Sequence, residues 1–125
     1  MQLKGRQLAI IILALATALL HFGAAFDKRI FPDMPDPLFT LNGLGYLGLL
    51  GAYFLPIPFA QKQHKLAWRV FFIYTIVTIV AWFLIYVLKF VIIDGHPFFS
   101  VDAMYGIPAK IVEFVLLYFL RKDKP

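Results

Sequence analysis

Cysteine is absent from this chain of 125 residues. Its absence excludes disulfide bonds, thiolate metal sites, iron–sulfur clusters and catalysis by a cysteine nucleophile. It also leaves the redox compartment undetermined, because there is no thiol whose oxidation state would indicate one.

Charge is also scarce. Charged residues make up 15% of the chain, whereas 62% of residues are hydrophobic and 18% are aromatic. About 25% of residues are charged in a typical soluble domain, so this composition, with a mean hydropathy of +0.81, excludes an ordinary soluble protein. The net charge of +5 does not indicate a nucleic-acid partner, because the basic residues flank apolar runs and do not cluster on a polar surface.

Four apolar runs fill most of the chain, at residues 8–26, 38–55, 67–93 and 103–120. A helix of eighteen residues is about 27 Å long, close to the thickness of the hydrocarbon core of a bilayer. We therefore predict an all-α fold, an integral membrane four-helix bundle that forms one domain over residues 1–125. The first run has features of a signal peptide, with Gly23-Ala24-Ala25 as a cleavage site. It is longer than a usual signal-peptide core, which favours a spanning helix.

Lysine and arginine are distributed unevenly between the two sides of such a bundle. One side has eight of them: Lys4, Arg6, Lys62, Lys65, Arg69, Arg121, Lys122 and Lys124. The other side has Lys28 and Arg29. The positive-inside rule then predicts that both termini are cytoplasmic and that the chain is a multi-pass protein of the cell membrane, the cytoplasmic membrane if the source is prokaryotic.

The last apolar run contains two charged residues, Lys110 and Glu113. A charged residue at the centre of a span costs about 2.5–3.5 kcal/mol. The spacing of i and i+3 places both side chains on one helix face, where they can neutralise each other. Two interpretations are open: a structural ion pair, or a buried site for a proton, an ion or a polar ligand head. A third is that this run lies in the interface and does not span.

Seven polar or aromatic residues from the four runs fall in one layer of the outer half. By helical rise their depths range from about 6 to 15 Å below the outer surface. We predict that they line a polar ligand-binding pocket between the helices: His21, Asn42, Tyr46, Trp82, Tyr86, Lys110 and Glu113.

The second run contains Gly43, Gly45 and Gly48, which formally match a dinucleotide-binding fingerprint. We discard the match because that motif requires a preceding strand within a βαβ unit. Glycines in a span more often indicate close helix packing, and Gly48 and Ala52 form a small-xxx-small pair. This pair could hold neighbouring helices or join two copies in a homodimer.

Other chemistry has little support in the sequence. No pair of His, Asp or Glu has the spacing of metal ligands, so we predict no metal site. A Ser/His/Asp arrangement is missing too, so we predict no catalytic residues and no enzyme activity. Haem or another lipophilic cofactor is an alternative, in which His21 and His96 would supply axial ligands.

Three functions follow as expectations. The first is an accessory or structural subunit of a larger membrane assembly, or a homo-oligomer, with the lipid bilayer as its surroundings and membrane proteins as partners. The second is a proton- or ion-coupled carrier for a small molecule, which would use the Lys110–Glu113 pair. The third is a bundle that binds haem or a lipophilic cofactor.

One resemblance rests on the second and third runs. Its residues are Leu38-Phe39-Thr40-Leu41-Asn42-Gly43-Leu44-Gly45-Tyr46, then Leu55-Pro56 and Thr78-Ile79-Val80-Ala81-Trp82. This pattern resembles small uncharacterised prokaryotic four-span integral membrane proteins. The resemblance implies the four-span fold over most of the chain and implies no activity.

Overall fold

The computed structural model describes residues 4–125, and its described part is helical with connecting turns. The elements are α1 (Gly5–Phe26), α2 (Pro37–Phe54), α3 (Pro58–Lys62), α4 (His64–Trp82), the π-helix η1 (Phe83–Ile93) and α5 (Val101–Lys122). The predicted all-α class is confirmed.

Local sequence explains where several helices begin and end. Asp36 caps α2, since its side chain accepts a hydrogen bond from the backbone N–H of Phe39 at 2.9 Å, and Pro37 occupies the first helical position. Pro56 and Pro58 follow the end of α2 and prevent its continuation. Arg121 and Lys122 lie in the last turn of α5, where positive charge interacts favourably with the helix dipole.

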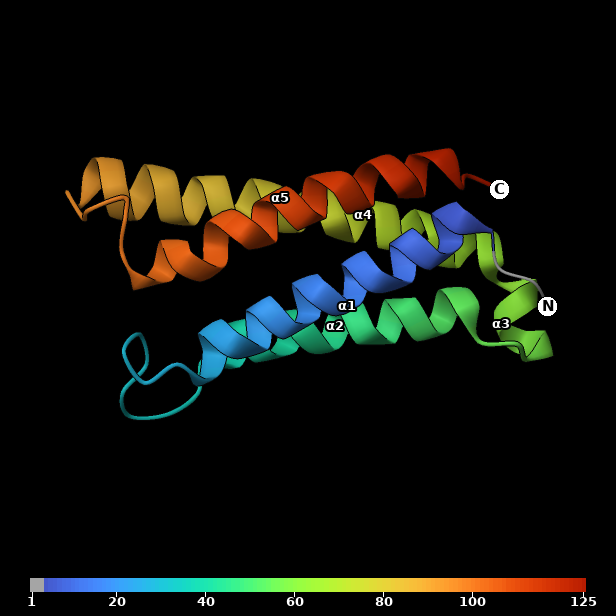
Figure 1. The fold of residues 1–125 in the computed structure, drawn as a ribbon, viewed down its shortest axis with the longest axis horizontal. Helices are drawn as coiled ribbons and strands as arrows, with labels where there is room; N and C mark the ends of the chain where they lie inside the picture. Colours follow the sequence, from blue (N-terminus) through green and yellow to red (C-terminus); the bar gives the residue numbers. More distant parts are fainter. Residues whose placement is uncertain (1–3) are drawn as a thin grey trace.

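The long helices form a bundle in which α1 lies between α2 and α5, while α4 packs against α5 and α2 (Figure 1). The start of α1 and the end of α5 lie at the same end of this bundle, next to α3 (Figure 1). We call this the terminal end. The loop after α1 and the turn before α5 lie at the opposite end, which we call the loop end.

Three helical segments are long and apolar enough to cross a membrane: Gly5–Phe26, His64–Ile93 and Val101–Lys122. The second of these is α4 and η1 together, which form one continuous helical rod. The helix α2 is not among the three; it has 18 residues and contains Asn42 and four glycines. Length and composition therefore identify a helical protein with three candidate spans.

Several polar residues lie inside the bundle beside its hydrophobic core, and many large apolar residues lie on the outside. The inner face of α1 is made mostly of small or polar residues that are at most 5% exposed: Ala14, Thr17, Ala18, His21 and Ala25. On the outside, Leu19 of α1 is 69% exposed and Ile73 of α4 is 58% exposed. So many exposed large apolar side chains are unusual for a soluble domain and typical of helices surrounded by lipid.

The expected role of Gly48 and Ala52 in packing within the chain is wrong. Both residues are exposed, and a Cβ at Gly48 would meet nothing within 4 Å. The close approaches in α2 occur instead at Gly43, where a Cβ would lie 2.9 Å from the ring of Phe22, and at Gly45, where a Cβ would collide with the Tyr74 hydroxyl. The Gly48–Ala52 face is thus exposed on the outside of the bundle.

Candidate functional site

Glu113 lies at the centre of the buried polar layer. Its side chain is fully buried, and the side chain of Lys110 is 7% exposed. Lys110 Nζ donates a hydrogen bond to Glu113 Oε1, and Tyr46 Oη donates one to Oε2. Tyr46 is also fully buried, so one carboxylate joins α2 to α5 and has both of its oxygens paired.

The helix α5 positions the two charged residues by their spacing alone. One turn separates Lys110 from Glu113 on the same face, and that face is turned toward α1, α2 and α4. Each charged group therefore has a partner of opposite charge instead of hydrocarbon, which lowers the cost expected for an isolated charge in a span.

His21 of α1 lies beside this network. Its ring centroid is 5.7 Å from that of Tyr46 and 6.1 Å from that of Phe39. Nδ1 lies 2.7 Å from the backbone carbonyl oxygen of Thr17, to which a protonated Nδ1 donates. The side chain is thus enclosed by aromatic rings from α2. His96, its proposed axial counterpart, is exposed in the turn before α5.

Asn42 is connected to the buried polar layer by Tyr74, a residue that was not predicted from the sequence. Tyr74 of α4 donates from Oη to Asn42 Oδ1 at 2.9 Å and lies 2.8 Å from the Asn42 backbone carbonyl. The ring of Tyr74 meets the ring of Tyr46 edge-on, with 5.0 Å between the centroids. Tyr74 lies in the third apolar run, where no spacing pattern distinguished it from its neighbours.

Trp82 and Tyr86 form a separate aromatic pair nearer the loop end. Their rings stack at 5.3 Å, and Tyr86 donates to the backbone carbonyl of Phe98 at 2.7 Å. Trp82 connects this pair to the buried charges, because Lys110 Nζ lies 6.0 Å from the centre of its ring. The seven predicted residues therefore lie in one region, with Glu113, Lys110 and Tyr46 in direct contact.

Two further polar clusters were missed because their members are far apart in the sequence. At the terminal end, the Asp123 carboxylate accepts hydrogen bonds from Arg6 Nε and Tyr53 Oη, each at 2.6 Å. At the loop end, Asp27 accepts a hydrogen bond from Tyr105 at 2.5 Å and two from the Arg29 side chain at 2.7 and 3.0 Å. These donors, Arg29 first, hold the pKa of Asp27 well below its usual range.

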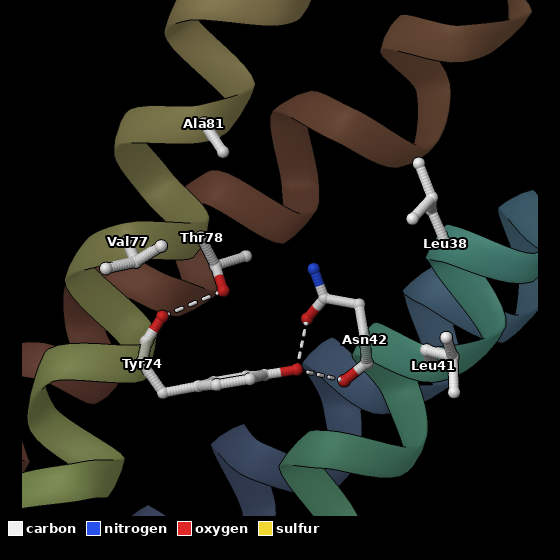
Figure 2. Close-up of a pocket in the computed structure, with 7 residues that line it drawn as sticks. All are labelled: Leu38, Leu41, Asn42, Tyr74, Val77, Thr78 and Ala81. Carbon is white, nitrogen blue, oxygen red and sulfur yellow. Dashed lines mark hydrogen bonds between the residues drawn. The ribbon is translucent and has the colours of Figure 1, made fainter.

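An open groove runs between α2 and α4. It has a volume of about 340 Å³ and is lined by Leu38, Leu41, Asn42, Tyr74, Val77, Thr78 and Ala81. Figure 2 shows Asn42, Tyr74 and Thr78 as its polar groups, and the ribbon of α5 passes behind the opening. We call this opening the α2–α4 groove.

The buried layer can hold a proton or position a polar group, since it combines a carboxylate, an ammonium group and phenols. Within residues 4–125 there is no group of three or more His, Asp or Glu side chains that could hold a metal ion.

Fold and site together define a class: a small helical protein with three candidate membrane spans and a charged network inside its bundle. Comparison with protein families, with curated proteins and with solved structures gave no match for this chain.

Proposed function

We propose that this chain is a four-span integral membrane protein with cytoplasmic termini that acts, without catalytic activity, as an accessory or structural subunit of a membrane assembly or homo-oligomer. The observation that carries the proposal is the contrast between the paired charges inside the bundle and the apolar side chains on its outer surface. The Lys110–Glu113–Tyr46 network satisfies its charges within the chain, whereas the outer surface offers apolar side chains to lipid or to partner helices.

The helix α2 supports both the fourth span and the association. It lies alongside α1 over its length (Figure 1), and Tyr46 buries its hydroxyl on Glu113 of α5. If α2 did not cross, this contact would have to form outside the bilayer. Its opposite face has Gly48 and Ala52 exposed, and small residues on a lipid-facing helix allow another helix to approach closely.

Association can be tested by purification in a mild detergent followed by cross-linking and mass measurement. The wild-type chain should elute with defined partners or as a discrete oligomer. The double variant Gly48→Leu/Ala52→Leu should lose that association, because two leucines hold a neighbouring helix away. The matched control is Val80→Leu, a change at an exposed position of α4. A chain that is monomeric under every mild condition would contradict the proposal.

A second candidate function is a proton-coupled carrier. The observation that favours it is the α2–α4 groove, whose lining residue Tyr74 contacts Tyr46, the partner of Glu113. Protonation of Glu113 would release its hold on Lys110 and Tyr46 and so change the inner wall. Glu113→Gln should then abolish any pH-dependent ligand binding or uptake, and an unchanged pH dependence would remove this candidate.

A further inference from the structure

The α2–α4 groove combines apolar walls with a polar floor. Leu38 and Leu41 of α2 face Val77 and Ala81 of α4 across it. Leu38 is 74% exposed and Val77 is 58% exposed, so the groove opens sideways from the bundle. In a chain whose helices cross the bilayer, a sideways opening faces lipid and not water.

Asn42 supplies hydrogen-bond donors to this groove. Its Oδ1 accepts from Tyr74, while Nδ2 donates to no group within residues 4–125. Figure 2 shows Nδ2 turned toward the open space between Thr78 and Leu38. An amide N–H without an acceptor is costly in an apolar environment. The groove therefore favours an occupant with an uncharged oxygen acceptor.

The depth of Asn42 restricts the occupant further. The helix α2 is about 27 Å long by helical rise, slightly shorter than the hydrocarbon core of about 30 Å. Asn42 lies about 6–8 Å from its loop end, one to two turns below the level where the ester groups of phospholipids meet the hydrocarbon. Figure 2 shows its side chain turned toward Leu38, which is one turn nearer that level, so an ester carbonyl that enters the groove can meet it. No Lys or Arg lines the groove, so a phosphate or a free carboxylate has no partner there.

We propose that the α2–α4 groove binds one diacyl glycerophospholipid, with an acyl chain between Leu38, Leu41, Val77 and Ala81 and an ester carbonyl accepting from Asn42 Nδ2. The inference rests on the proposed crossing of α2 but not on the accessory role. The bound lipid would satisfy Asn42 and fill the space between two helices of the bundle, whichever assembly the chain joins.

The test uses the full chain in nanodiscs of phosphatidylcholine that contain a phosphatidylcholine with a photoactivatable diazirine on one acyl chain. After irradiation, mass spectrometry locates the adducts. In the wild-type chain they should concentrate at residues 38–42 and 77–81 and exceed those at Leu47 and Ile73, two exposed lipid-facing positions.

Two variants and one control sharpen the result. Ala81→Trp should fill the groove, and Asn42→Leu should remove the hydrogen-bond donor. In Asn42→Leu, Tyr74 can still donate to the backbone carbonyl of residue 42. Either change should lower the yield of adducts in the groove about threefold or more. A loss of this size corresponds to one lost hydrogen bond, or to lost space for the lipid, in a membrane. Val80→Trp, on the exposed face of α4, should leave them unchanged.

Several results would overturn the proposal. Adducts spread evenly over exposed positions, or groove adducts that persist in Ala81→Trp, would show that no lipid is bound there. If a neutral prenyl quinone, equimolar with the diazirine phosphatidylcholine, prevented the adducts from forming, the groove would be assigned to another carbonyl compound. If α2 carried no adducts even at Leu47, the crossing of α2 would fail instead, which distinguishes the two claims.

Discussion

Glu113 accepts one hydrogen bond from its own helix and one from α2, so its contribution to the stability of the bundle cannot be divided between the two bonds. Lys110 and Tyr46 approach the same carboxylate from different sides. Removal of one partner from a buried ion pair leaves the other charge without compensation, whereas removal of both leaves apolar surface. The network is therefore expected to respond as a unit to mutation.

A double-mutant cycle tests this coupling. Glu113→Leu and Lys110→Met alone should each lower the free energy of unfolding by about 3–5 kcal/mol, because each leaves a buried charge unpaired. The loss of unfolding free energy in the double variant should be smaller than the sum of the two single losses, by more than about 1 kcal/mol. Unfolding by dodecyl sulfate in mixed micelles, followed by circular dichroism, measures these values. Strictly additive losses would show that the two side chains do not act together.

The sequence was sufficient to find the charged pair but not all of its surroundings. Lys110 and Glu113 share a face by spacing, and Tyr46 and His21 were placed in the same layer by their depth along the helices. Tyr74 could not be found in this way. Its role depends on how α4 is rotated against α2, and the spacing of residues within one helix does not determine that rotation.

At the scale of helices, Gly106 determines how closely α5 approaches α4. A Cβ at this position would lie 2.6 Å from Trp82 Nε1, which is too short for any real contact. Trp82 in turn lies over the Lys110 ammonium group. The missing side chain at Gly106 thus allows an aromatic ring to cover a buried charge.

Gly106→Ala should force Trp82 to move and should lower the free energy of unfolding by about 1–3 kcal/mol, the usual cost of overpacking. Tryptophan emission and thermal unfolding in detergent measure the two effects. The matched control is Gly48→Ala, where nothing lies within 4 Å of the added Cβ; it should be neutral or stabilising by up to about 1 kcal/mol. Equal effects at both positions would contradict the packing described here.

The loop after α1 is attached to α5 through Asp27 and Tyr105. Because its partners lower the pKa of Asp27, the attachment is present above the ordinary aspartate value of about 3.9 and is lost only as the pH falls well below it. A fluorophore on Met34→Cys should report an unchanged loop from pH 7 to pH 4 and release in stronger acid. Asp27→Asn should release the loop at every pH. Release of the wild-type loop between pH 6 and pH 5 would contradict this assignment.

The helix bounds were largely predictable, because apolar runs and prolines determine them. The predicted runs 8–26 and 103–120 lie within α1 and α5, and the run 38–55 ends one residue beyond α2. The short helix α3 and the π-helical hydrogen bonding of η1 were not predicted. The residues of η1 are as apolar as those of α4, and nothing in a hydrophobic run distinguishes a π-helix from an α-helix.

At the scale of the whole molecule, polar clusters at three levels hold the helices together. Asp123 joins α5 to Arg6 of α1 and to Tyr53 of α2 at the terminal end. Glu113 joins α5 to α2 in the middle, and Asp27 is joined to Tyr105 of α5 at the loop end. Helices surrounded by lipid gain little from hydrophobic association, so contacts of this kind and close packing have to hold them together.

If α2 crosses the bilayer with the other long helices, as proposed, all four shelter the charged network. Since the chain has no cysteine, single cysteines at four exposed positions can be labelled without background: Asp33, Lys62, His96 and Lys124. The measurement is their reaction with a membrane-impermeant maleimide in intact cells. If α2 crosses, Asp33→Cys and His96→Cys should react from outside, and Lys62→Cys and Lys124→Cys should react only after lysis. Reaction of Asp33→Cys and Lys62→Cys from the same side would contradict the crossing.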